Sequence, residues 1–234
     1  MTGTPHLHVH EPHGAVGAVA LVLHGGRSNS TRRVRASQLA VLRMLPFAAS
    51  LRRAGVRQGL AVAQLRFTVR GWNGAQRSPV ADAQWALGEL RRRFPDAPVA
   101  LVGHSMGGRA AVYAAGFPTV RAVVGLAPWI EDGDPVEQLA GRRILFAHGE
   151  HDRMTSPRAS AAFAQRAARV AESVSYVSVE AERHAMLRRA RVWHELVTGF
   201  VLGVLCGTAP EGTAEDATTN VVGKALAGQA ALVV

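Results

Sequence analysis

A serine, an aspartate and a histidine, each placed just after an apolar run, are the residues of this sequence best suited to chemistry. Ser105 lies in the stretch Gly103-His-Ser-Met-Gly107, after an apolar run at 99–102 and before an Ala-rich helical run that continues to residue 115. A serine between a strand and a helix needs a cramped turn, and glycines two residues before and after it let the two backbones pass. The pattern predicts a nucleophile elbow that lifts the Ser105 hydroxyl above the edge of a sheet.

A serine hydroxyl is a weak nucleophile near neutral pH, so it needs a base, and the base needs an acid to hold it. Asp152 follows an expected strand at 143–147, and His184 follows the last expected strand at 174–179. The carboxyl ends of parallel strands meet at one edge of a sheet, where ligands bind. We therefore expect Ser105, Asp152 and His184 to converge there.

Other residues compete for the acid and base roles. Asp152 is favoured as the acid because its loop is short and anchored at the strand end, and His184 as the base because the rival histidines neighbour the acid. Those rivals would need their loop to fold back. His104, beside the serine, is expected to be a packing residue. The alternatives are Asp132 and Asp134 for the acid, and His148 and His151 for the base.

A second informative stretch, His24-Gly-Gly-Arg27, ends the almost wholly apolar run at 16–23. Two glycines after a buried strand let the backbone approach a ligand and leave amides unpaired, which suits an oxyanion hole. The Met106 amide, at the start of the helix after Ser105, would complete it. Among the candidate donors we favour the Gly26 amide, with Arg27 next.

The composition is that of a globular protein, with 48% hydrophobic and 19% charged residues in 234. The net charge of +10 comes almost wholly from arginine, because Lys224 is the only lysine. A lysine confined to the C-terminal tail argues against a P-loop and against Schiff-base chemistry. The single Cys206 excludes an internal disulfide and a Cys-rich zinc site.

The remaining features bear on partners and location. The arginines are scattered and lack an accompanying aromatic RNA-binding module, so no nucleic-acid partner is expected. No basic and apolar leader opens the sequence, and the longest mostly apolar run, 196–207, is too short to span a bilayer. We expect a cytoplasmic protein that does not contact membranes. A histidine group could bind a metal, but a solvated edge hairpin is favoured; it comprises His6, His8, His10 and His13.

Strands and helices alternate along the chain, which predicts an α/β fold: a three-layer sandwich with a mostly parallel, doubly wound sheet flanked by helices. Residues 1–207 are expected to form this domain, and 208–234 a loosely ordered C-terminal tail. Besides the runs above, we expect strands at 6–10, 60–67 and 120–126. Helices are expected at 31–54, 78–94 and 156–172, and a final helix is expected to end near 205. Pro46 should kink or break the first of these helices.

The four motifs, in this order and on alternating strands and helices, resemble the α/β-hydrolase family over residues 6–205. They are His24-Gly-Gly26, Gly103-His-Ser-Met-Gly107, His148-Gly-Glu-His-Asp152 and Glu182-Arg-His184. The resemblance implies Ser105 as nucleophile, Asp152 as triad acid and His184 as general base, with Gly26 and Met106 amides in the oxyanion hole and no metal or organic cofactor. In layout the chain is most similar to small carboxylesterases and dienelactone hydrolase-like proteins.

Many members of that family carry a helical cap before the acid-bearing strand. Only residues 127–142 occupy that place here, so an open site without a large cap is expected. The implied function is hydrolysis of a small-molecule carboxylic ester through an acyl-enzyme. The alternatives are a peptidase, thioesterase or acyltransferase with the same triad, or a non-catalytic scaffold that binds a small molecule. Loop residues expected to line the substrate pocket are Arg27, Arg70, Trp72 and Trp129.

Overall fold

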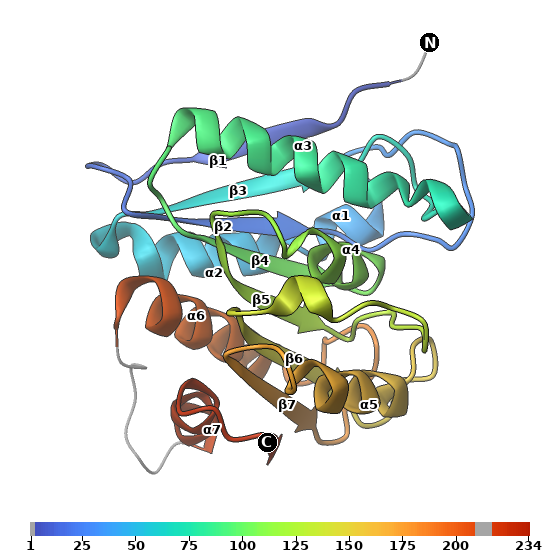
Figure 1. Cartoon of the computed structure of the whole chain (residues 1–234), viewed down its shortest axis with the longest axis vertical. Coiled ribbons are helices and arrows are strands. Elements are labelled where there is room, and N and C mark those ends of the chain that lie inside the picture. Colours follow the sequence, from blue (N-terminus) through green and yellow to red (C-terminus); the bar gives the residue numbers. More distant parts are fainter. Residues whose placement is uncertain (1–2, 209–216) are drawn as a thin grey trace.

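One sheet of eight strands organises the computed structural model, which describes residues 3–208 and 217–234 (Figure 1). The strand order is β1-β3-β2-β4-β5-β6-β7-β8, and all neighbours are parallel except the antiparallel pair β1 and β3. The strands are β1 His6–His10, β2 Ala18–Leu23, β3 Leu60–Arg66, β4 Val99–His104, β5 Val120–Leu126, β6 Arg143–Gly149, β7 Ser173–Val179 and β8 Ala231–Val233.

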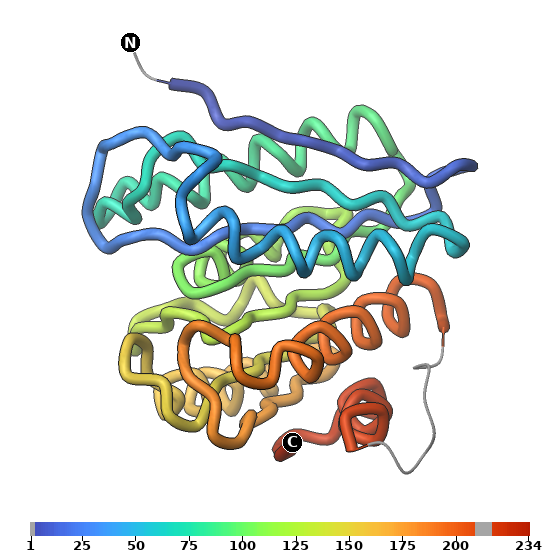
Figure 2. The backbone as a smooth tube through the Cα atoms, turned by 180° about the vertical axis from the view of Figure 1, so that it is seen from behind, coloured from blue at the N-terminus to red at the C-terminus, as the bar shows by residue number. Residues whose placement is uncertain are grey.

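Helices cover both faces of the sheet, which gives the three-layer α/β sandwich expected from the sequence (Figures 1 and 2). Helices α3 (Ser78–Arg93), α4 (Met106–Ala114) and α5 (Pro157–Ala167) pack on one face, and α2 (Leu45–Gly55), α6 (Ala190–Cys206) and α7 (Ala217–Leu226) on the other. Alternate residues of β2 face the two apolar cores, since side chains along a strand point to opposite faces. Because both faces are covered, all six residues of β2 are buried.

Two expected elements differ in the structure. The expected helix at 31–54 begins only at Leu39; its expected break near Pro46 is confirmed, because Pro46 lacks an amide proton and is accommodated in the first turn of α2, which separates α2 from α1 (Leu39–Leu42). The expected hairpin is wrong, since β1 pairs with β3 rather than with the strand that follows it. Parallel strands β3 and β4 occupy both sides of β2, so β1 cannot pair with β2 and instead pairs with the outer edge of β3.

The expectation of a loosely ordered tail is wrong for residues 217–234, which form α7 and β8. A Cβ atom added at Gly199 or Gly203 would lie 2.7 Å from Val222 or 2.5 Å from Leu226, so the glycines of α6 let α7 approach closely. The chain then returns as β8, parallel to β7 at the edge of the sheet. The small residues of this region therefore allow a close contact between two helices, and the domain continues beyond residue 207. Residues 209–216 of the expected tail lie outside the described part of the chain.

The connection between β5 and β6 contains one short 3₁₀ turn, Glu137–Leu139, and carries no cap domain. Two further 3₁₀ turns lie at Val56–Gln58 and Gly74–Gln76. Within the described ranges, no helix has the length and apolar character needed to cross a membrane. The loops at the carboxyl edge of the sheet carry the residues considered next.

Candidate active site

Ser105 occupies a strained turn between β4 and α4. Its backbone angles are φ 54° and ψ −119°, a conformation that costs a residue other than glycine about 1–3 kcal/mol. A Cβ atom added at Gly103 would lie 2.2 Å from the Gly107 carbonyl oxygen, and one added at Gly107 would lie 2.5 Å from the His24 carbonyl oxygen. The glycines on both sides of Ser105 are therefore required by close backbone packing, as the elbow pattern predicts.

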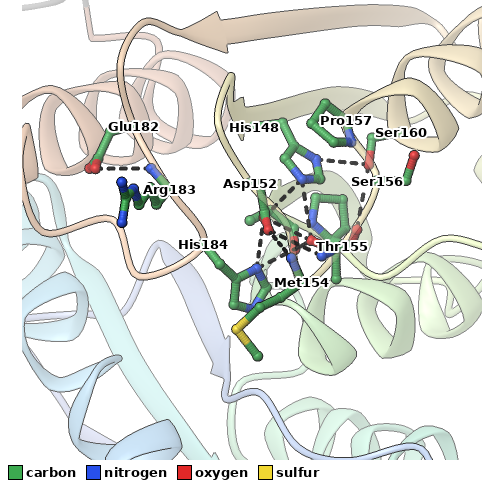
Figure 3. Close-up of polar contacts among 12 residues, drawn as sticks. His148, Asp152, Met154, Thr155, Ser156, Pro157, Ser160, Glu182, Arg183 and His184 are labelled. Carbon is green, nitrogen blue, oxygen red and sulfur yellow. Dashed lines mark hydrogen bonds and ion pairs between the residues drawn. The ribbon is translucent and has the colours of Figure 1, made fainter.

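His184 and Asp152 form a hydrogen-bonded pair at the same edge of the sheet (Figure 3). Nδ1 of His184 lies 2.8 Å from Oδ2 of Asp152, and the Asp152 side chain is fully buried, whereas that of His184 is 12% exposed. His184 and Ser105 line one open hollow of about 300 Å³. The three residues singled out by the sequence thus come from separate crossings of the sheet and gather around one site.

The Asp152 carboxylate accepts hydrogen bonds at both oxygens (Figure 3). Oδ1 accepts from the amides of Met154 and Thr155, at 2.7 and 3.1 Å, and Oδ2 accepts from the Thr155 hydroxyl at 2.9 Å. Burial alone would raise the pKa of Asp152, but the hydrogen bonds from His148, His184 and these groups outweigh it and lower the pKa. Asp152 therefore stays ionised at neutral pH and can hold an imidazole.

His148 is the residue at this site whose role the sequence did not indicate. Its ring is fully buried, Nε2 lies 3.0 Å from Oδ2 of Asp152, and Nδ1 lies 3.0 Å from the Ser160 hydroxyl. The loop folds back because β6 continues to Gly149 and the Asp152 amide donates to the Gly149 carbonyl. His148 therefore shares an oxygen of the acid with His184, although its own ring is closed off from solvent.

Replacing His148 by phenylalanine should weaken activity through Asp152. The substitution removes a hydrogen bond to a charged group, about 1.5–3 kcal/mol, so kcat/KM for a reaction that uses the His184–Asp152 pair is expected to fall by about tenfold or more. His148→Gln, which keeps an N–H donor, should fall less. The exposed His151→Phe serves as the control, since the His151 side chain lies 3.7 Å from Glu150 and does not bond to Asp152. Equal kcat/KM values for His148→Phe and wild type would contradict this role.

The candidate oxyanion donors differ in whether their amides are free. The Arg27 amide donates to the Arg70 carbonyl at 2.8 Å, which removes it as a donor to substrate. Within the described part of the chain, the Gly26 and Met106 amides have no hydrogen-bond partner. Nδ1 of His24 lies 2.6 Å from the Gly25 carbonyl oxygen. The Gly25 carbonyl and the Gly26 N–H belong to the same peptide bond, which is trans, so they point in opposite directions. The hydrogen bond with His24 therefore directs the Gly26 N–H away from His24.

His104 is buried, as a packing residue should be, and it also supports the loop of His184. Its Nε2 lies 3.1 Å from the His184 carbonyl oxygen, and the two ring centres are 4.7 Å apart. Burial, followed by the neighbouring His184, lowers the pKa of His104 to about 3. Burial likewise lowers the pKa of His24 to about 4, against a partly offsetting hydrogen bond to Gly25. Both imidazoles are therefore neutral in the folded protein.

These two buried histidines predict acid sensitivity. Each histidine has a pKa in the folded protein that is below the ordinary 6.5. As the pH falls below 6.5, these histidines therefore take up protons in the unfolded chain before they do so in the folded protein. The free energy of unfolding is thus unaffected by them above pH 6.5 and decreases as the pH falls toward 3–4. The free energy of unfolding should decrease by up to about 1.4 kcal/mol per pH unit for each histidine. Urea titrations from pH 6.5 to 4.5 give the free energy of unfolding as a function of pH. Its decrease with falling pH should be less steep in His104→Gln than in wild type, by the equivalent of about one bound proton. The exposed His13→Gln should match wild type, and an unchanged slope in His104→Gln would count against this assignment.

The rival acids lie in other surroundings. Asp134 is buried and binds Arg109 and the Tyr113 hydroxyl, each through Oδ1 at 2.7 Å, so it holds a different cluster, and Asp132 is exposed. Glu182 is a further buried carboxylate that the sequence did not single out as a structural residue. It accepts from Trp193 Nε1 at 2.8 Å and from the Arg183 amide, and so fixes the loop that carries His184.

The residues expected to contact substrate are divided between two hollows. Arg27 and Trp129 line the hollow that contains Ser105, whereas Trp72 is 4% exposed and lines a neighbouring one. Arg70 donates to the Arg33 carbonyl. Among the described residues no group of three or more His, Cys, Asp or Glu side chains is arranged to hold a metal ion, and this includes the histidines of β1.

A strained serine on a turn above a parallel sheet is a feature of hydrolases built on this fold. The model of the alpha/beta hydrolase family matches residues 20–234, and since the match spans most of the chain, the protein belongs to this family. A search of curated proteins found no significant match.

Solved structures with the same fold were found in number, at identities that show the fold alone. A putative alpha/beta hydrolase from Agrobacterium tumefaciens is 13% identical, with a TM-score of 0.67 over 88% of this chain and 94% of that one. An α/β serine hydrolase without a lid from Xanthomonas campestris is 16% identical, with a TM-score of 0.60 over 82% and 86%. Est1E from Butyrivibrio proteoclasticus, with ferulic acid bound, is 13% identical, with a TM-score of 0.61 over 86% and 95%.

Proposed function

We propose that the protein is a serine esterase that cleaves a carboxylic ester through an acyl-enzyme on Ser105. One observation carries the proposal: His184, joined to Asp152 at 2.8 Å, lines the same hollow as a serine held in the strained elbow conformation. Membership of a hydrolase family supports hydrolysis as the reaction class. A serine hydrolase without a lid is among the structural neighbours, and another neighbour, Est1E, binds ferulic acid, a carboxylic acid of the kind that cleavage of an ester releases.

The reaction follows from the chemistry of these groups. His184 removes the proton of the Ser105 hydroxyl as the serine oxygen attacks the ester carbonyl, and ionised Asp152 stabilises the imidazolium that forms. The Gly26 and Met106 amides donate to the oxyanion, each contributing about 3 kcal/mol to transition-state stabilisation. His184 then gives its proton to the leaving alcohol. A water molecule repeats the sequence on the acyl-enzyme and releases the acid.

Hydrolysis of chromogenic esters tests this proposal. Purified protein should hydrolyse p-nitrophenyl esters, with a burst of p-nitrophenol equal to the enzyme concentration where deacylation is slow. The panel should include acyl chains of rising length and a feruloyl ester, with a thioester and an anilide to separate esterase from thioesterase and peptidase activity. Absence of hydrolysis of every substrate would favour a binding scaffold instead.

A further inference from the structure

A second hollow adjoins the one that contains Ser105, and the proposed reaction makes no use of it. Its volume is about 330 Å³, and Ser28 and Trp129 line both hollows. A substrate whose carbonyl lies at Ser105 and which extends past Trp129 would therefore enter the second hollow. Remote contacts of this kind determine which substrate an enzyme selects.

The wall of the second hollow is rigid. Arg109 is buried, Nη2 donates to Asp134 at 2.7 Å and to Glu131 at 2.6 Å, and these two carboxylates more than offset its single charge. The guanidinium carbon of Arg109 lies 4.4 Å from the ring centre of Trp72 and 4.6 Å from that of Trp129. Arg109 thus fixes two aromatic rings and has no charge left for a ligand.

Arg77 is the cation of this hollow that remains without a carboxylate partner. It is exposed, its guanidinium carbon lies 4.8 Å from the Tyr113 ring centre, and it forms no ion pair with any residue in 3–208 or 217–234. Its backbone has φ +46°, a left-handed conformation that is costly for arginine. The loop is held in place by Asn73, whose Oδ1 accepts from the Ser30 amide at 2.8 Å.

We propose that the second hollow is a specificity subsite for a carboxylate carried by the substrate, bound by the Arg77 guanidinium. The inference rests on the proposed esterase function and names its substrate class: an ester that bears a free carboxylate on its acyl or its alcohol part. The planar guanidinium matches a carboxylate in two parallel hydrogen bonds that lie in its own plane, and the Tyr113 ring packs against the face of the guanidinium, where it does not compete with them. The net charge of +10 adds long-range attraction for such an anion.

Two matched pairs of chromogenic esters test the subsite. The acyl arm compares mono-p-nitrophenyl esters of dicarboxylic acids with p-nitrophenyl alkanoates of equal carbon number. The alcohol arm compares the acetate of 5-hydroxy-2-nitrobenzoic acid with p-nitrophenyl acetate. Wild type should favour the charged member of at least one arm by about tenfold in kcat/KM at low salt, and the preference should shrink as salt is added.

In the Arg77→Gln variant, the ratio of kcat/KM for the charged ester to kcat/KM for the neutral ester should fall about tenfold, so that the preference for the charged ester disappears. The ratio cancels any general change in folding or activity. Arg57→Gln, in the 3₁₀ turn before β3 at the opposite edge of the sheet, removes the same charge and should keep the wild-type ratio. Arg27→Gln tests the exposed arginine that lines the hollow of Ser105.

The outcomes separate the subsite from the reaction. If neutral esters are hydrolysed but neither charged series is preferred, or if the preference is lost in Arg27→Gln and kept in Arg77→Gln, the subsite is overturned while the esterase function stands. If wild type hydrolyses no ester, the proposed function itself fails.

Discussion

Replacing Ser105 by alanine is expected to lower kcat for p-nitrophenyl acetate by at least about four orders of magnitude. The acyl-enzyme cannot form without the serine oxygen, and only the oxyanion donors and substrate binding then act on a direct attack by water. Alanine takes up less space than serine in the same strained turn, so the fold should be kept. Initial rates and far-UV circular dichroism of the same preparations measure both effects.

The matched control for this substitution is Ser37→Ala, at an exposed position outside every element. It should retain wild-type kcat. A Ser105→Ala variant that kept more than about one hundredth of wild-type turnover, well above the residual expected without the nucleophile, would show that another group attacks the substrate.

Replacing His184 by alanine should cost about three orders of magnitude or more in kcat, the second largest effect. Ser105 would then lose the base that removes its proton, and Asp152 would keep its contacts with His148 and the Thr155 hydroxyl. Because the deletion leaves space at the hollow, added imidazole should restore part of the activity to His184→Ala and none to Ser105→Ala. Stopped-flow measurement of the burst locates the loss in acylation.

His151→Ala is the control for this experiment, because His151 is an exposed histidine on the loop of Asp152. Wild-type turnover is expected for it. If His184→Ala were fully active, the base role would pass to another histidine.

The sequence predicted the parts of the fold that depend on local periodicity. Strand β5 has the expected bounds at both ends, and α6, expected as the final helix, buries Trp193, Leu196 and Phe200, whose spacing of three and four residues places them on one helix face. The arrangement of β1 was not predictable in this way, because a two-residue period identifies a strand and not its partner. Pairing is set by which edge of the sheet is free.

At the site, the residues predicted were those that follow strands, and the residues missed were those that act through tertiary contacts. His148 and Thr155 reach Asp152 only because the loop after β6 turns back on itself. Glu182 becomes a structural residue only when Trp193 of α6 packs beneath it. A carboxylate four residues after a histidine at a strand end is the signal that could have drawn attention to His148.

The residues after 216 were missed for a related reason. Val221, Val222 and Ala225 are spaced as one helix face, but their small side chains give a weak apolar signal on their own. Their burial depends on Gly199 and Gly203 of α6, which leave room for them. Such complementarity between two helices far apart in the chain cannot be read from either helix alone.

The most direct test of the account is whether Ser105 is an activated nucleophile. Wild-type protein treated with a fluorophosphonate and digested should yield one modified peptide, with the phosphonyl group on Ser105. Ser105→Ala should give none, and His184→Ala should be modified far more slowly. Wild-type protein that stays unmodified, or carries the group on a different residue, would contradict the account.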